Sequence, residues 1–238
     1  MIDPDDSDAQ SLLYARDLAQ LHQLRRAYEK LLPRGLPGAV APPPVVRTVT
    51  ALFTDLNGFT RLTEQFEHDP AGLLDVLNAH LKVVVRAITI CGGVVEKFVG
   101  DGVMATFGAE GGLPDHVERS MAAAIGLIGA NEALNRRRSN HWGFRLEVGV
   151  GIATGPVVVG SIGPRERSEL GVLGDCVNVA ARLVAHAEGG EILMTGAVHS
   201  ALADKLSSVL TDRSAVRGRT GSLSIYRMAL LGGRSAIE

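Results

Sequence analysis

Two short apolar runs, VVEKFV and VMATFG, flank the tripeptide Gly100-Asp101-Gly102. Both runs are rich in β-branched and aromatic residues, which favour β-strands. An Asp-Gly pair between two such runs is a strong signal for the turn of a β-hairpin. The segment therefore predicts an antiparallel pair of strands, and it places the carboxylate of Asp101 at the tip of their turn.

Other strands and helices alternate along the chain around this hairpin. Residues 45–56, VVRTVTALFTDL, form a predicted buried strand that stops at Asn57-Gly58. Apolar residues at helical spacing predict one helix that ends at Gly92-Gly93 and another over about residues 115–137. The remaining elements are two strands, FRLEVGVGIAT and PVVVGSI, a helix over about residues 176–187, and smaller strands and a helix within residues 191–232. This order predicts an α+β fold, a ferredoxin-like sandwich with an antiparallel sheet and helices on one face.

An additional helix is expected before this domain, in residues 1–32. Its apolar or amphipathic residues are spaced by four and three, as in a short coiled-coil seam: Tyr14, Leu18, Leu21, Arg25, Tyr28 and Leu32. A second register, through Leu21, Leu24, Tyr28 and Leu31, fits nearly as well. A single amphipathic helix packed on its own domain is the alternative. Five prolines in residues 33–44 then predict a semi-rigid linker, and residues 233–238 form a tail.

The net charge and the cysteine content indicate which binding partners and which cellular compartment to expect. A net charge of −2 gives no global basic field, so we expect neither a nucleic acid nor an anionic membrane as partner. Any anionic substrate must then be held by local groups. Cys91 and Cys176 lie far apart without metal-type spacing, which favours two reduced core residues in a cytoplasmic protein. The acidic start of the chain and the absence of an apolar run of about 20 residues predict no signal peptide or membrane span within this sequence.

Two aspartates could form a metal site. Asp55 ends the apolar strand before Asn57-Gly58, and Asp101 sits in the hairpin turn. Taken alone, Asp55 is better explained by a cap on the loop that follows, and for Asp101 the explanation by good turn chemistry is stronger still. If the two strands are neighbours, both carboxylates meet at one edge of the sheet. Two metal ions about 3.5–4 Å apart, bridged by such carboxylates, can clamp the attacking and leaving oxygens of a phosphoryl transfer.

A second pair of polar residues lies in the predicted helix DCVNVAARL. Asn178 and Arg182 are four residues apart and therefore share one face of that helix. An arginine and an asparagine on an accessible face could stabilise charge developing at phosphorus and orient a ribose. The alternative is an Arg182 paired with a surface carboxylate and an Asn178 that acts as a helix-start residue.

Taken together, FTDLNGFT, EKFVGDGVMATFG and GDCVNVAAR resemble, in order and spacing, the three core signatures of class III adenylate and guanylate cyclases of bacterial type. The resemblance covers residues 45–228 and implies that residues 45–232 are a cyclase catalytic domain. For this chain the resemblance implies conversion of ATP to 3′,5′-cyclic AMP and pyrophosphate, in a head-to-tail homodimer with composite active sites. The N-terminal helix resembles signalling helices that join sensor domains to cyclases, although the chain contains no evident sensor.

The resemblance also implies a role for each site residue. Asp55, Leu56 and Asp101 would hold two Mg²⁺ or Mn²⁺ ions, Asn178 would orient the ribose, and Arg182 would stabilise the transition state. The triphosphate would lie against backbone N–H groups of Leu56, Asn57, Gly58, Phe59 and Thr60. Arg217, with Arg219 as second choice, would meet the polyphosphate, although an ordinary solvated loop charge explains each of them equally well.

Purine choice is where the chain departs from this family. Lys97 matches the adenine-selecting lysine, but the partner position, usually Asp, Thr or Ser, is Gly171. Gly149 stands where some relatives carry an arginine directed to the phosphates. We therefore expect an adenylate cyclase, with a guanylate or mixed-specificity cyclase, or a catalytically weak regulatory domain, as alternatives. Diguanylate cyclases and polymerase palms also pair acidic residues, but they lack a pair such as Asn178 and Arg182.

Overall fold

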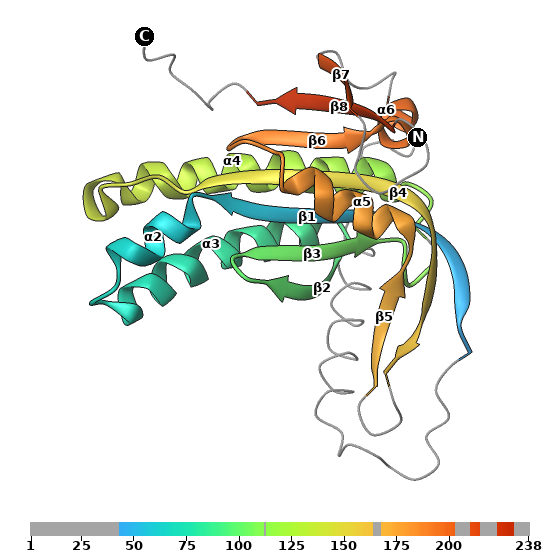
Figure 1. The fold of residues 1–238 in the computed structure, drawn as a ribbon, viewed down its shortest axis with the longest axis horizontal. Coiled ribbons are helices and arrows are strands. Elements are labelled where there is room, and N and C mark those ends of the chain that lie inside the picture. Colours follow the sequence, from blue (N-terminus) through green and yellow to red (C-terminus); the bar gives the residue numbers. More distant parts are fainter. Residues whose placement is uncertain (1–42, 112, 164–167, 203–209, 215–222, 231–238) are drawn as a thin grey trace, which may run out of the picture.

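The computed structural model describes residues 43–111, 113–163, 168–202, 210–214 and 223–230 (Figure 1). The predicted helix in residues 1–32, most of the proline-rich linker, Arg217, Arg219 and the tail at 233–238 lie outside the described residues. Among the described helices, none is both long enough and apolar enough to cross a membrane.

An eight-stranded sheet forms the centre of the domain, with the order β2-β3-β1-β4-β6-β8-β7 and with β5 paired to β4. The strands are β1 (Val45–Asn57), β2 (Val94–Val99), β3 (Gly102–Phe107), β4 (Glu147–Ile162), β5 (Glu169–Leu173), β6 (Glu191–Thr195), β7 (Leu210–Ser214) and β8 (Leu223–Ala229). All neighbouring pairs are antiparallel except β4 and β6, which are parallel. The predicted α+β fold and the hairpin of β2 and β3 are confirmed.

β4 is one continuous strand of 16 residues, where the sequence predicted two. The prediction was wrong because the two expected strands divide at Gly155-Pro156, where the observed strand continues. β4 pairs with β1 over residues 147–159, with Pro156 opposite Thr48. On its other edge, β6 pairs with residues 150–152 and β5 with residues 158–162, so within the described part of the chain no strand pairs with Pro156 there. A residue without an N–H group fits such a gap in the ladder.

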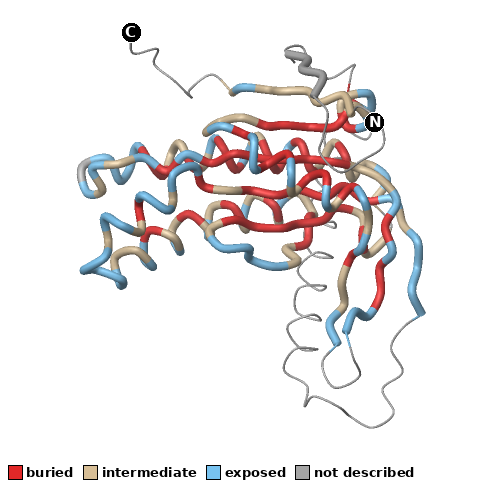
Figure 2. The backbone as a smooth tube through the Cα atoms, viewed as in Figure 1, coloured by how far each residue is buried: buried red, intermediate tan, exposed pale blue. Residues whose placement is uncertain are grey.

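Helices cover both faces of the sheet, which corrects the expected placement on one face. The first face carries α2 (Phe59–Gln65), α3 (Pro70–Ile90), α4 (His116–Trp142) and α6 (Gly196–Leu202), packed in one apolar core. α5 (Asp175–Val184) packs with a second core on the opposite face. The reason lies in the strands, because Val49 to Thr54 of β1 and all of β3 are buried (Figure 2). Such continuous apolar runs need cover on both sides.

A track of small residues on β4 lets α5 lie directly on the strand. On this face of β4 lie Gly151, Ala153 and Gly155 next to α5, and Gly149 next to Ala187, which follows the helix. A Cβ at Gly151 would come within 2.4 Å of the Ala180 carbonyl oxygen and 2.5 Å of the Val184 nitrogen. Only glycine therefore permits this approach, which sets the position of α5 over β4.

The start of β1, the second half of β4 and β5 together form an arm that projects from the body of the domain (Figure 1). Large apolar side chains are exposed on it: Val45, Val46, Val158, Ile162 and Leu173. Exposed apolar groups gathered on one element mark a surface for an interaction with another molecule.

Candidate active site

The two aspartates of interest meet at one edge of the sheet. β3 lies beside β1, with Thr54 opposite Val103, so the turn before β3 reaches the end of β1. The backbone N–H of Leu56 donates a hydrogen bond of 3.0 Å to Oδ2 of Asp101. The carboxylates of Asp55 and Asp101 are therefore neighbours, as expected if their strands adjoin.

Glycines on both sides of Asp101 shape this turn. Gly100 has a φ of +62°, a left-handed conformation that side chains with a Cβ rarely adopt. A Cβ at Gly102 would lie 2.0 Å from the carbonyl oxygen of Thr54, so only glycine lets the two strands approach. The Val103 N–H also donates to Oγ1 of Thr54 at 3.0 Å. The Gly-Asp-Gly sequence is thus required for the approach to β1 as well as for the turn.

Electrostatics indicate that the two carboxylates suit a cation. Burial raises the pKa of Asp55 above its ordinary value, and the nearby negative charge of Asp101 raises it further. A divalent cation between the two groups would relieve this repulsion. No group of three or more His, Cys, Asp or Glu ligands occurs in the described part of the chain. Because Mg²⁺ is commonly held by one or two carboxylates with substrate oxygens, the pair alone fits a substrate-linked metal.

Asp55→Asn is expected to raise the melting temperature of the metal-free protein. A carboxyl whose pKa is raised on folding destabilises the folded state at neutral pH, and this penalty disappears as the pH falls through the folded-state pKa. The substitution removes the penalty at every pH. Thermal unfolding with EDTA at pH 7 and pH 4 measures it, with Asp75→Asn on the exposed surface of α3 as control. A lower melting temperature than that of the wild type at pH 7 contradicts the prediction.

The segment from Leu56 to Thr60 follows Asp55 directly. The side chain of Leu56 is buried, and Asn57 donates from Nδ2 to the carbonyl oxygen of Ala187 at 3.0 Å. Gly58, with a φ of +76°, precedes α2. Phe59 and Thr60 open α2, where no earlier carbonyl of that helix is available to their N–H groups.

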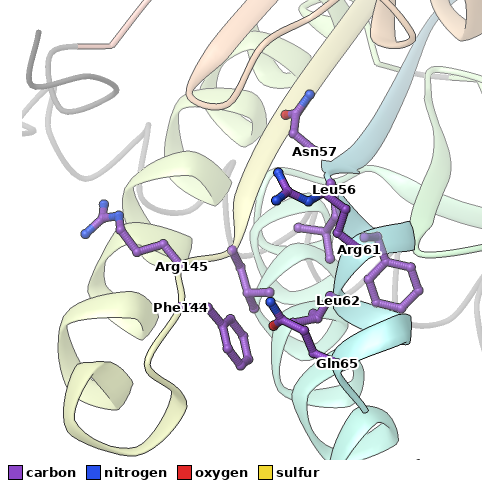
Figure 3. A pocket seen from close by; sticks show the side chains of 10 residues that line it. Leu56, Asn57, Arg61, Leu62, Gln65, Phe144 and Arg145 are labelled. Carbon is purple, nitrogen blue, oxygen red and sulfur yellow. The ribbon is translucent and has the colours of Figure 1, made fainter. Parts of the chain in front are cut away.

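A pocket of about 190 Å³ lies beside this segment (Figure 3). Its walls come from the end of β1, from α2 and from the connection between α4 and β4: Leu56, Asn57, Gly58, Phe59, Arg61, Leu62, Gln65, Phe144, Arg145 and Leu146. Both apolar and cationic side chains therefore face the space beside the segment that follows Asp55.

Asn178 and Arg182 lie on a different element, the exposed surface of α5. Cys176, Val179, Ala180 and Leu183 of the same helix are buried against the sheet. The helical repeat thus presents the two polar residues away from the sheet, as predicted. Arg182 also interacts within the chain. Neither Arg217 nor Arg219 can be placed, since both lie outside the described residues.

The residues expected to select the purine are exposed or half-exposed. Lys97 lies on β2, at the edge of the sheet and beside an irregularity in its pairing with β3. Gly171 lies on the arm, opposite Gly160. Gly149 stands opposite Asp55 in the ladder, and a Cβ there would come within 2.9 Å of the carbonyl oxygen of Ala187. The backbone near Ala187 therefore occupies the place of any side chain at position 149.

A buried polar network behind the pocket was missed in the sequence. Asn131 Nδ2 donates to the Leu146 carbonyl at 2.6 Å, and its Oδ1 lies 2.9 Å from Nδ1 of the fully buried His80. Asn135 both donates to and accepts from the Leu146 backbone at 2.9 Å. The available signal was two asparagines four residues apart within the apolar face of α4. The network holds the start of β4 against the pocket wall.

The chain was compared with known proteins, and the matches agree on one class of protein. A sequence model of the Adenylate and Guanylate cyclase catalytic domain matches residues 42–229. An adenylate cyclase of Anabaena cylindrica is 31% identical over 220 residues, which cover 85% of this chain and 42% of that protein. Adenylate cyclase 1 of Rhizobium meliloti (strain 1021) is 32% identical over 184 residues, which cover 76% of this chain and 27% of that protein. This chain thus spans less than half the length of these curated relatives.

Solved structures agree with the sequence matches. The guanylyl cyclase Cya2 superposes with a TM-score of 0.73 at 30% identity, over 78% of this chain and 93% of that one. The adenylyl cyclase CyaB from P. aeruginosa superposes with a TM-score of 0.68 at 29% identity, over 78% of this chain and 95% of that one. Fold and matches together define a nucleotide cyclase catalytic domain. The chain belongs to the adenylate and guanylate cyclase catalytic domain family.

Proposed function

We propose that this protein is an adenylate cyclase that converts ATP to 3′,5′-cyclic AMP and pyrophosphate. The observation that carries the proposal is the contact between the Leu56 N–H and Asp101, which brings Asp55 and Asp101 together at the sheet edge. In the reaction the 3′-oxygen of ATP forms a bond to the α-phosphorus and loses its proton. The bond from that phosphorus to the oxygen shared with the β-phosphate breaks, and pyrophosphate leaves.

Each residue of the candidate site has a defined task in this reaction. Asp55 and Asp101, with Leu56 beside them, would hold two Mg²⁺ or Mn²⁺ ions, which supply positive charge next to the reacting phosphate when bound. The N–H groups between Asn57 and Thr60 bind the triphosphate. Asn178 orients the ribose, and Arg182 stabilises the negative charge that develops at the α-phosphate. Arg217, or Arg219 as second choice, meets the polyphosphate.

We infer that the active sites are composite and form in a head-to-tail homodimer. Asp55 and Asp101 of one subunit would face Lys97, Asn178 and Arg182 of its partner. Two observations support this arrangement. The polar residues of α5 lie on its exposed surface, away from the sheet of their own chain. The projecting arm carries exposed apolar side chains that a second copy would bury.

The preference for ATP rests on Lys97, which would contact the purine ring. Gly171 supplies no side chain for a second contact, and the relatives include both adenylate and guanylyl cyclases. A guanylate or mixed specificity is therefore the second candidate function. A catalytically weak regulatory domain is less well supported, since Asp55, Asp101 and Arg182 are all present. The two free cysteines, Cys91 and Cys176, support a cytoplasmic location.

Lys97→Glu is expected to lower turnover of ATP by about 10-fold to 100-fold relative to turnover of GTP. A glutamate replaces a donor with an acceptor, and an unpaired polar contact costs about 1–3 kcal/mol. Competition assays with both nucleotides measure the ratio of the two kcat/KM values. An unchanged ratio means that Lys97 does not contact the base. Lys82→Glu, on the exposed surface of α3, is the matched control.

The proposed function is tested directly with purified protein. We expect ATP and Mn²⁺ or Mg²⁺ to give cyclic AMP and pyrophosphate in equal amounts, and EDTA to stop the reaction. A parallel reaction with GTP separates the first candidate from the second. Formation of neither cyclic nucleotide, by a protein that is folded and dimeric, would contradict both candidates and favour a regulatory domain.

A further inference from the structure

The side of the site that binds the terminal phosphates lacks one expected source of positive charge. Gly149, opposite Asp55, has no side chain, and the carbonyl of Ala187 would lie 2.9 Å from a Cβ placed there. Asp55 and Asp101 add negative charge next to this place. Among the described residues, a bound triphosphate therefore gains no cation from position 149 of β4, and any cation for its terminal phosphates must come from another element.

The pocket beside the segment from Leu56 to Phe59 contains two arginines with different surroundings. Arg145 pairs with Glu132, so its charge is partly balanced within the chain. Arg61 is exposed, and among the described residues we find no carboxylate within ion-pair distance of it. In Figure 3 the Arg61 side chain extends from α2, with its guanidinium drawn beside Leu56 and below Asn57. The unbalanced cation thus faces the segment that follows the metal-binding aspartate.

We propose that Arg61 binds the terminal phosphates of the nucleotide, and of the pyrophosphate product, in the same subunit that supplies Asp55 and Asp101. The inference rests on the proposed function, and it adds a binding residue to that site. A guanidinium presents several N–H donors in a fixed plane, which matches the oxygens of a phosphate group. Arg61 supplies positive charge from α2, beside the segment from Leu56 to Phe59 whose N–H groups bind the triphosphate in the proposed function.

This assignment predicts which ligands depend on Arg61. ATP and pyrophosphate contain the phosphates that Arg61 contacts, whereas cyclic AMP contains only the α-phosphate. Arg61→Ala is therefore expected to weaken the binding of ATP and of pyrophosphate by about 10-fold to 100-fold, because charge-assisted hydrogen bonds are lost. Inhibition by cyclic AMP is expected to stay within about twofold of the wild type. Arg61→Lys keeps the charge but loses the planar fork, so its affinity for pyrophosphate should be intermediate.

Two measurements test the assignment, with Arg86→Ala on the exposed surface of α3 as matched control. The first is the KM for ATP compared with kcat. The second is calorimetric binding of pyrophosphate in the presence of Mg²⁺, which needs no turnover. Unchanged pyrophosphate affinity in Arg61→Ala overturns the proposal. A wild-type protein that binds pyrophosphate but makes no cyclic nucleotide contradicts the proposed function instead, and the calorimetric comparison still decides the role of Arg61.

Mixed dimers show in which subunit Arg61 acts. When Arg61→Ala is mixed with Asp55→Ala, the one active site of the mixed dimer has its metal end on the Arg61→Ala chain, so its KM should be high. When Arg61→Ala is mixed with Arg182→Ala, the active site takes its metal end from the chain that retains Arg61. Its KM should then match that of the wild type. The reverse pattern would place Arg61 in the partner's half of the site and overturn the proposal.

Discussion

Asp101→Asn is expected to reduce cyclic AMP formation by about 10²-fold to 10⁴-fold while the domain stays folded. The substitution removes one negative charge from a pair that would hold two divalent ions, and such ions contribute several kcal/mol of charge stabilisation. Asparagine retains an oxygen that can accept the hydrogen bond from the Leu56 N–H. The local structure of the turn should therefore persist, and the loss of activity should follow from the charge alone.

The measurement is kcat with ATP at saturating Mn²⁺, together with the melting temperature. Asp75→Asn removes a charge from the exposed surface of α3 and should leave kcat within about twofold of the wild type. If Asp101→Asn kept near-normal kcat, Asp101 would not bind a catalytic metal. A large drop in melting temperature would instead indicate that the charge itself holds the turn against β1, and Asp55→Asn would then provide the test of the metal pair.

Mixing two inactive variants is expected to restore about a quarter of wild-type activity. Asp55→Ala removes the metal end of a site, and Arg182→Ala removes the partner's contribution from α5. In a head-to-tail dimer of the two, one site collects both defects and the other collects neither. Random exchange gives about half mixed dimers, each with one intact site of two, which yields about a quarter overall.

The control mixture pairs Asp55→Ala with Asp101→Ala. Every composite site then has a defective metal end, so no activity should return. Subunit exchange is demonstrated independently, for example by mass measurement of dimers that carry tags of different size. Continued inactivity of the first mixture after such exchange refutes the composite site, as does equal recovery in the control.

Most elements of the fold could be predicted because they depend on local patterns. The predicted strand at residues 45–56 agrees with β1 within one residue, and the Asp-Gly turn gave the hairpin of β2 and β3. Both signals act over a few residues of chain, through strand propensity and turn geometry. The division of β4 at Pro156 was wrong because a proline's effect depends on whether a strand lies beside it, and this is a property of the sheet.

In the candidate site, too, the local features could be predicted from the sequence, whereas the contacts between distant segments could not. Asp55, Asp101, Asn178 and Arg182 could be selected from the sequence because each stands in a recognisable local context, at a strand end, in a turn or on one helix face. The sequence could predict that Asp55 and Asp101 are neighbours only on the condition that β3 lies next to β1. The order of strands in the sheet meets this condition.

The sequence by itself determined the residue types available to the site, the main helices and strands, and the family resemblance through three separate motifs. Only the tertiary structure decided that α5 packs on the opposite face from α3, that Ala187 occupies the place of a side chain at position 149, and that Arg61 faces the pocket. These features arise where segments distant in the chain approach within a few ångströms. Such contacts depend on the packing of the whole sheet, and spacing along the chain does not specify them.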